Sequence, residues 1–265
     1  MKPNEIERNI IQFSQGTFYS KKDRIVTEVP MTIKLNGEEF VTIVCTPEYI
    51  EDMVIGYLAA EAVIKEYDDI TSIWIQEAEG YVHVATKDVN PYVQSLQNKR
   101  YITSCCGASR QGFVFANDAL IAEQFHHINV RITPETCLHL MDELQGLAQT
   151  YQNTGGVHNA ALCDAEGVIL SRMDIGRHNT LDKIYGYCLK HHIAMEGKII
   201  VFSGRISSEI LLKVAKIGCE IILSKSAPTE LALTLGEALG ITIVGFIRND
   251  SFNIYTGAKR IIQEV

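Results

Sequence analysis

The sequence predicts an α/β protein with a larger C-terminal part, built on a mixed sheet, and a smaller N-terminal α+β part. After residue 156, short runs of Val, Ile and Leu alternate with amphipathic segments, which is the pattern of strands and helices that follow one another along the chain. Before residue 90, two pairs of extended runs flank a single helical pattern. We place the boundary between the two parts after residue 125, so that they span 1–125 and 126–265.

The N-terminal part begins with a segment, 1–24, that has no sustained apolar period. We expect a loosely held arm with one short strand there. From Ile25 to Cys45, two extended runs flank Asn36-Gly37, the dipeptide that best tolerates the positive φ angles of a type I′ turn. This arrangement predicts a β-hairpin.

The next elements are a helix and a second hairpin. Thr46 has the side chain of an N-cap, a proline and an acidic residue follow it, and the apolar spacing predicts a helix over 47–65. Alternating residues on both sides of Gly80 predict a hairpin over 71–87. Pro91 then opens a short helix.

The C-terminal part begins with an expected strand at 128–132 and a helix over 133–152. Two apolar runs over 156–174 predict another hairpin. Asn179, with Asp182 three residues later, resembles a capping box and opens a helix. The rest alternates between buried strands at 198–203, 219–224 and 241–247 and helices at 207–217 and 229–239.

These last three strands should be parallel, because near-continuous apolar strands suit a sheet covered on both faces, and the loops after them then share one edge. The loops are 203–205, 224–229 and 246–251, and each combines small residues with a cation. Two of them precede helix N-termini, which attract phosphate. One interpretation is a site for an anionic, nucleotide-like ligand, and the other is a set of ordinary capping loops.

Two further runs, 154–159 and 174–179, combine glycine with basic and amide side chains. Neither is a dinucleotide-binding or Walker motif. His178 fits a ligand contact or a capping role, whereas His158 is better explained as structural.

Composition limits the function. The chain has 24 Lys+Arg against 32 Asp+Glu, a formal charge of −8, so non-specific binding to nucleic acid or to an anionic membrane is not expected. The seven cysteines are odd in number, and Cys45, Cys163, Cys188 and Cys219 lie in apolar segments, which favours a reducing compartment. No signal peptide or membrane span is recognisable, so we expect a cytoplasmic protein.

The stretch 101–113 differs from these segments, because two adjacent thiols, Cys105 and Cys106, lie among small and polar residues. Arg100 and Arg110 lie on either side, and nearby cations favour the thiolate, which is the nucleophile. A nucleophile or sulfur carrier, a metal site and a structural turn are all compatible with this loop.

The order of these motifs resembles one protein family. A CC-containing loop is followed by TGGVHNAAL, DIGRHNTLDK, SGRISSE, SKSAPT and GFIRNDSFNIYTG. This series is similar to the FdhD/NarQ family of formate dehydrogenase accessory sulfurtransferases. The resemblance implies a cytidine-deaminase-like three-layer sandwich and a homodimer. It also implies that sulfur is taken from a cysteine desulfurase as a persulfide and passed to the Mo-bis(molybdopterin guanine dinucleotide) cofactor of formate dehydrogenase.

The resemblance also assigns residues. The family's loop commonly reads CxxC, and its first cysteine falls on Cys105, the expected persulfide carrier, whereas its second falls on Ala108. This chain therefore departs from the pattern. The family's cofactor segment falls on Phe246, Ile247, Arg248, Asn249, Asp250 and Ser251, and Arg205 and His178 are expected to help.

Two rival functions follow from the same features. A deaminase would need HxE and PCxxC motifs to hold zinc, but His158 is followed by Asn159-Ala160 and no PCxxC exists, so we expect no metal site. A non-catalytic chaperone that only binds and delivers the molybdenum cofactor remains an alternative. Detection of a persulfide distinguishes it from a sulfurtransferase.

Overall fold

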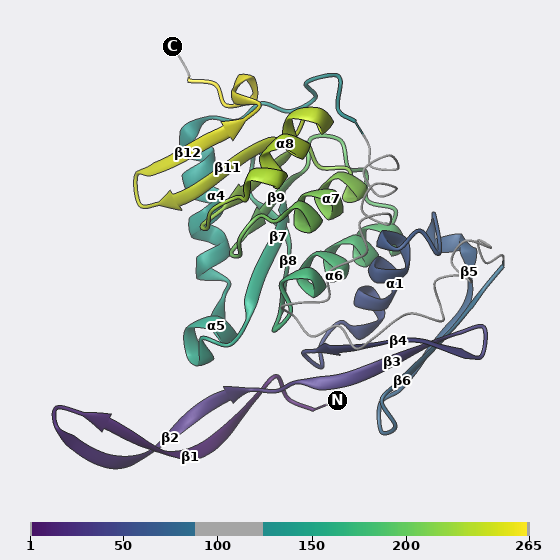
Figure 1. Ribbon diagram of the computed structural model, residues 1–265, viewed down its shortest axis with the longest axis vertical. Helices are drawn as coiled ribbons and strands as arrows, with labels where there is room; N and C mark the ends of the chain where they lie inside the picture. Colours follow the sequence, from purple (N-terminus) through teal and green to yellow (C-terminus); the bar gives the residue numbers. More distant parts are fainter. Residues whose placement is uncertain (1, 88–123, 264–265) are drawn as a thin grey trace.

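A computed structural model describes residues 2–87 and 124–263, which form three sheets of two, four and six strands (Figure 1). The cysteine loop at 101–113 and the helix expected after Pro91 lie outside the described residues. Within the described ranges, no helix is both long enough and apolar enough to cross a bilayer.

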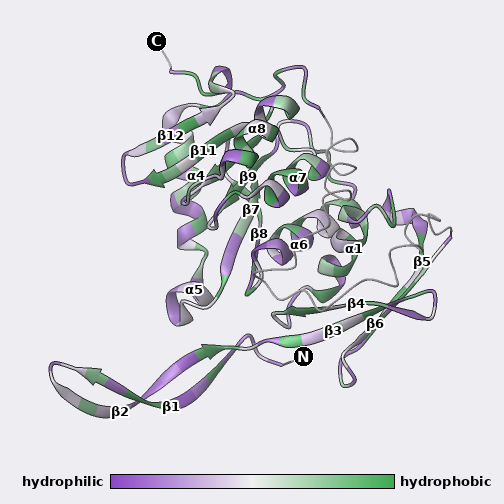
Figure 2. Ribbon diagram, viewed as in Figure 1, coloured by the Kyte–Doolittle hydropathy of each residue, from purple (hydrophilic) through white to green (hydrophobic). Residues whose placement is uncertain are grey.

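The N-terminal segment is a two-stranded antiparallel ribbon, so the expectation of a loose arm with one short strand was wrong. β1 (Glu5–Ser14) pairs with β2 (Thr17–Val26) along its whole length, and the ribbon extends away from the rest of the protein (Figure 1). Polar and apolar residues are interspersed along both strands (Figure 2). Some cross-strand contacts are ion pairs, such as the one between Lys22 and Glu7 at 3.3 Å. Strands that pair through charged side chains lack the alternation of apolar and polar residues by which strands are predicted.

The four-stranded sheet contains both predicted hairpins. Its strands are β3 (Val29–Leu35), β4 (Glu38–Cys45), β5 (Ile70–Gln76) and β6 (Tyr81–Thr86), in the order β4-β3-β6-β5, and η1 (Tyr67–Asp69) precedes β5. Asn36 and Gly37 have φ angles of 51° and 91° in the turn between β3 and β4. The type I′ requirement for two positive φ angles is therefore met by the dipeptide that the sequence offers.

One helix covers this sheet, and it is shorter than predicted. α1 (Ile50–Ala60) packs on the apolar face of the sheet, where Met53, Ile55 and Leu58 are buried. Its N-cap is Tyr49, not Thr46. Thr46 cannot cap α1, because its backbone N–H and hydroxyl both donate to Asp174 Oδ2, at 3.0 and 2.9 Å.

The six-stranded sheet is mixed, in the order β12-β11-β10-β9-β7-β8. The hairpin of β7 (His158–Cys163) and β8 (Val168–Asp174) is confirmed, and so are the parallel pairs of β9 (Ile199–Phe202), β10 (Ile221–Ser224) and β11 (Thr242–Arg248). β7 runs antiparallel to β9. The sequence did not predict β12 (Ser251–Thr256), which pairs antiparallel with β11. The loop expected at 246–251 is therefore the end of a β-hairpin.

Helices cover both faces of this sheet. α6 (Arg177–Lys190), α7 (Ser208–Ile217) and α8 (Glu230–Leu239) pack against one core cluster, and α4 (Pro134–Gly146) packs against a second cluster on the opposite face. Two short helices, α5 (Gln149–Thr154) and η2 (Ala258–Arg260), complete the fold. The cytidine-deaminase likeness and the boundary at residue 125 stay predictions.

Three expected details of these elements were wrong. The helix over 133–152 is two helices, because the chain leaves helical geometry around Ala148 (φ −82°, ψ 49°). The segment 128–132 forms no strand, although Ile132 makes one isolated bridge to Ile261. Asn179 does not cap α6, because its amide donates to Val44 O and Asp174 Oδ1, and Gly176 is the N-cap.

α1 and α6 join the four-stranded and six-stranded sheets through direct backbone contact. A Cβ atom at Gly56 would lie 1.9 Å from the carbonyl oxygen of Asp182, and one at Gly186 would lie 1.8 Å from that of Asp52. No residue other than glycine fits either position without moving a helix.

Candidate functional site

The predicted persulfide carrier, Cys105, lies with Cys106 and the whole loop 101–113 outside the described residues. The four cysteines expected in the core are buried, as is Cys137. Burial raises the pKa of the Cys137 and Cys163 thiols to about 12. Thiols of this kind are protonated at neutral pH and react poorly as nucleophiles.

The loops predicted to share one edge do so. The carboxyl ends of β9, β10 and β11 meet there, and the antiparallel course of β7 and β8 brings His158 and Asp174 to the same edge. Hydrogen bonds connect the loops, from Ser226 Oγ to Ser203 O at 3.0 Å and from Phe246 N to Ser226 O at 3.3 Å. This edge is the usual ligand position of an open α/β sheet.

Three basic side chains gather beside the first turn of α6. The pKa of His158 is lowered by burial and by the positive charges of Arg177 and His178, although Asp174 offsets part of this effect. A Cβ atom at Gly204 would lie 3.4 Å from His158 Nδ1, so this histidine also borders the loop after β9. His158, expected to be structural, is therefore part of the edge.

Two nitrogens of this group have no hydrogen-bond partner among the described residues. They are Arg177 Nε and His178 Nε2, and both are inaccessible to solvent. His178 Nε2 lies 3.1 Å from Glu209 Oε2, close enough for an ion pair but not in hydrogen-bond geometry. Buried donors without acceptors are costly. An anion at this edge would accept from Arg177 Nε, which has no such carboxylate beside it, and the positive end of the α6 dipole would also favour the anion.

The other predicted cofactor residues lie at the end of the β11–β12 hairpin or near it. Phe246, Arg248, Asn249, Asp250 and Ser251 are exposed, as is Arg205 in the loop after β9. Ile247 differs, because its side chain is packed in the core with α4. The only atoms that Ile247 could offer a ligand are those of its backbone. Phe246 and Asn249 have positive φ angles of 55° and 45°, uncommon for residues other than glycine.

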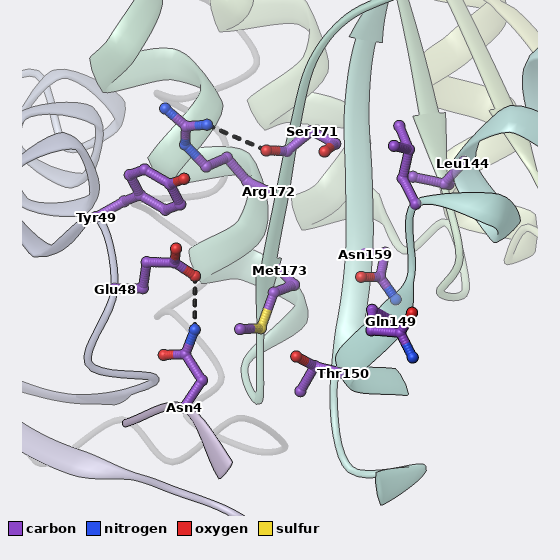
Figure 3. Close-up of a pocket in the computed structure, with 11 residues that line it drawn as sticks. Asn4, Glu48, Tyr49, Leu144, Gln149, Thr150, Asn159, Ser171, Arg172 and Met173 are labelled. Atoms are coloured by element: carbon purple, nitrogen blue, oxygen red, sulfur yellow. Dashed lines mark hydrogen bonds between the residues drawn. The ribbon is translucent and has the colours of Figure 1, made fainter. Parts of the chain in front are cut away.

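A cavity of about 190 Å³ lies one residue further along β7 and β8 from this edge, where the N-terminal part meets these strands and the junction of α4 and α5 (Figure 3). Its walls are mostly polar and include Glu48, Asn159 and Arg172. Sequence patterns do not predict this cavity, because its walls come from five separate segments of the chain. Elsewhere in the described ranges, no group of three or more His, Cys, Asp or Glu side chains is placed to hold a metal ion.

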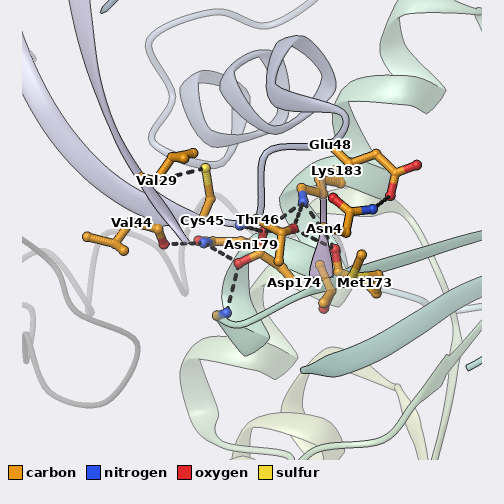
Figure 4. Close-up of polar contacts among 12 residues, drawn as sticks. Asn4, Val29, Val44, Cys45, Thr46, Glu48, Met173, Asp174, Asn179 and Lys183 are labelled. Carbon is orange, nitrogen blue, oxygen red and sulfur yellow. Dashed lines mark hydrogen bonds and ion pairs between the residues drawn. The ribbon is translucent and has the colours of Figure 1, made fainter. Parts of the chain in front are cut away.

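The motif DIGRHNTLDK forms a buried polar network that sequence reasoning missed (Figure 4). Lys183 Nζ donates to Asp174 Oδ2 and Thr46 Oγ1, each at 2.7 Å. The second carboxylate oxygen of Asp174 accepts from Gly176 N and Asn179 Nδ2, each at 2.8 Å. Asn179 and Lys183 are four residues apart, a spacing that places them on one face of α6 and was the available signal.

Known proteins resemble this chain over nearly its whole length. The model of the FdhD/NarQ family matches residues 26–262. The sulfur carrier protein FdhD of Bacillus subtilis (strain 168) is 52% identical over 254 residues, which are 96% of each chain. That of Shouchella clausii (strain KSM-K16) is 51% identical over 258 residues, 97% of each chain.

A solved structure has the same fold. It is the crystal structure of a putative formate dehydrogenase accessory protein from Desulfotalea psychrophila, with a TM-score of 0.80 and 21% identity. The superposition covers 98% of this chain and 100% of that one. With a family match over 26–262 and relatives that are half identical from end to end, the chain belongs to the FdhD/NarQ family.

Proposed function

We propose that the protein is a sulfurtransferase that accepts sulfur from a cysteine desulfurase as a persulfide on Cys105. It then transfers the sulfur to the molybdenum bis-guanine-dinucleotide cofactor that formate dehydrogenase requires. The observation that carries this proposal is the 51% identity, over 97% of the chain, with a protein named a sulfur carrier. A homodimer and a cytoplasmic location are part of the same proposal.

Sulfur transfer begins at the thiolate of Cys105. It attacks the outer sulfur of the desulfurase persulfide, the donor's S–S bond breaks, and the desulfurase cysteine leaves as a thiolate. The S–S bond of the Cys105 persulfide then breaks, Cys105 leaves as a thiolate, and the outer sulfur passes to molybdenum of the bound substrate, whose oxidation from Mo(IV) to Mo(VI) supplies the two electrons that reduce it to a sulfido ligand. The described cysteines support this assignment indirectly, because burial raises the pKa of Cys137, Cys163 and Cys188 to about 11 or 12.

The substrate's phosphates bind at the edge of the six-stranded sheet. The Nε atom of Arg177 supports this placement, because it is buried and has no acceptor among the described residues. Arg205 and Arg248 are exposed and can contact phosphate oxygens with two nitrogens each. At the hairpin, Phe246 offers a stacking surface, and the Asp250 carboxylate can accept from the N1–H and N2–H₂ groups of guanine.

Mass spectrometry after incubation with a desulfurase and cysteine tests the sulfur transfer. We expect an adduct of roughly 32 Da, one sulfur atom, on the wild type and not on Cys105→Ala. Cys106→Ala should retain it in part, and Cys188→Ala is the control for a buried thiol. A persulfide that survives on Cys105→Ala would refute the assignment. Nucleotide binding without any persulfide would favour the non-catalytic chaperone.

A further inference from the structure

The ribbon of β1 and β2 lacks a covering layer among the described residues. No residue of either strand is buried, and neither outer edge pairs with another described strand. A two-stranded ribbon alone in water is marginally stable at best, and long free edges favour pairing with another chain. A ribbon that extends from the rest of the protein in this way therefore needs a surface that covers it (Figure 1).

The distal half of the ribbon carries exposed apolar side chains. Phe13 and Phe18 lie opposite each other with ring centroids 4.9 Å apart, yet they are 60% and 72% exposed. Ile11, two residues before Phe13 on the same strand, shares its face and is 68% exposed. Tyr19 adds an exposed ring on the other face. We call these four residues the tip, and exposed apolar clusters of this kind mark interaction sites.

A second exposed apolar group lies where the ribbon joins the rest of the protein. It consists of Ile25 near the end of β2, Leu147 between α4 and α5, and Tyr151 in α5, and all three are exposed. α5 is held against this end of the ribbon, because Asn153 Nδ2 donates to Glu5 Oε2 at 3.1 Å. We call Ile25, Leu147 and Tyr151 the base.

Charged residues of both signs lie on the ribbon between its tip and its base. Arg8, for example, is opposite Asp23, and Glu7 is opposite Arg24. If two ribbons lie antiparallel about a two-fold axis through this middle section, the tip of each reaches the base of the other and the charged sections meet. A two-fold contact requires a surface that is complementary to itself, and this order of apolar, charged and apolar sections meets that requirement.

We infer that the ribbon is covered by the ribbon of a second copy of this chain, tip against base, in a two-fold dimer. The tip and the base together present seven large side chains that are about half exposed, which is about 700 Å² per copy and about 1,400 Å² in a pair. Stable interfaces bury about 1,200–2,000 Å² in total.

Charge also favours a second copy at this place. The whole chain has a formal charge of −8, so two copies repel each other over most of their surfaces. The two strands of the ribbon carry four basic and three acidic residues and are nearly neutral. Repulsion is therefore smallest where the ribbons meet. The inference rests on the homodimer of the proposed function, whose contact surface it names, and does not depend on sulfur transfer.

Sedimentation velocity of the full chain at micromolar concentrations tests the contact. We expect a dimer for the wild type. The double variant Phe13→Ser/Phe18→Ser and, separately, Tyr151→Ser should each weaken dimerisation at least about tenfold, because truncation of a central interface aromatic costs that much or more. Tyr151 lies outside the ribbon, so its variant remains informative even if the ribbon unfolds without its phenylalanines. Leu231→Ser, at an exposed position of α8, is the control.

Paired cysteine replacements test the direction of the ribbons. Phe18→Cys combined with Tyr151→Cys should form a disulfide between two copies under mild oxidation, and peptide mapping identifies the bond. Within one copy the bond cannot form, because the strand from Phe18 to Ile25 holds the two positions at least about 20 Å apart. A bond between the two copies of position 18 instead would contradict the tip-to-base arrangement.

The possible failures of the inference are distinguishable. A wild type that stays monomeric would overturn the ribbon contact together with the proposed homodimer. A dimer that persists unchanged in Phe13→Ser/Phe18→Ser and in Tyr151→Ser would overturn the ribbon contact and leave the homodimer standing. Persulfide formation on Cys105 is measured separately, so neither result is confused with a failure of the proposed sulfur transfer.

Discussion

Lys183 Nζ lies 2.7 Å from Asp174 Oδ2, and both side chains are fully buried. The pair lies between the two parts, because Lys183 also donates to Thr46 beyond β4 and Asp174 accepts from the first turn of α6. Every polar atom of the pair has a partner, which is the condition under which a buried ion pair is tolerated.

Lys183→Met should lower the free energy of unfolding by about 3–5 kcal/mol, because it leaves the Asp174 carboxylate buried and uncompensated. Lys190→Met is a matched control on the same helix. Lys190 pairs with Glu51 at 2.7 Å, but the two side chains are 30% and 36% exposed, so we expect a loss below about 1 kcal/mol. Denaturant unfolding measures both, and equal losses would contradict the account.

Gly56→Ala should destabilise the protein by at least about 2 kcal/mol, because the added methyl group would overlap the Asp182 carbonyl and push α1 away from α6. Gly146→Ala, at the end of α4, meets no atom within 4 Å and should be neutral or slightly stabilising. Thermal unfolding of the two variants separates a close helix contact from a general effect of replacing glycine. A tolerated Gly56→Ala would contradict the backbone contact.

Acid should destabilise the protein through His158. Burial and the neighbouring cations lower the pKa of this histidine in the folded state. The unfolded chain, with a histidine pKa near 6.5, then binds the proton more readily. His158 therefore contributes stability above about pH 6.5, and this contribution is lost as the pH falls through that value to the lower folded pKa. His158→Gln should flatten the decline, measured by denaturant unfolding between about pH 8 and 5, whereas His139→Gln, at an exposed site, should not.

GDP should bind at least about tenfold tighter than ADP, because guanine offers the Asp250 carboxylate two donors that adenine lacks, and hydrogen bonds to a charged group contribute about 1.5–3 kcal/mol. Asp250→Ala should narrow this gap, since the carboxylate is the group proposed to recognise guanine. Arg248→Ala should weaken both nucleotides equally, because phosphate contacts carry no base information. Calorimetry measures the six affinities, and equal wild-type affinity for GDP and ADP would refute guanine recognition at this hairpin.

Local signals in the sequence were enough where the chain makes local structure. Asn36-Gly37 predicts its hairpin because the turn needs positive φ angles, and the apolar runs of β9 to β11 predict parallel strands because both faces are covered. Thr46 and Asn179 led to wrong predictions of helix N-caps, because contacts distant in the sequence determine what these side chains bond to. Both have capping side chains, but tertiary contacts with Asp174 engage them instead.

In the candidate site, too, features set by local sequence could be predicted and features set by tertiary contacts could not. The gathering of the three loops at one edge could be predicted from the sequence, because parallel strands have their carboxyl ends at the same edge of a sheet. The position of His158 beside Arg177 could not, because it depends on the pairing of β7 with β8 and β9. The inward direction of the Ile247 side chain likewise depends on the hairpin of β11 and β12. The sequence did not predict the second strand of that hairpin.

The contact of α1 with α6 through Gly56 and Gly186 also limits how the protein can move. Two backbones in direct contact have no intervening layer of side chains that could change rotamers and let one helix slide over the other. Rotation of the four-stranded sheet against the six-stranded sheet would have to separate the helices and expose their buried faces to water. Hinge closure of the two parts is therefore disfavoured, and the ligand proposed for the sheet edge would have to enter and leave through movements of loops and side chains.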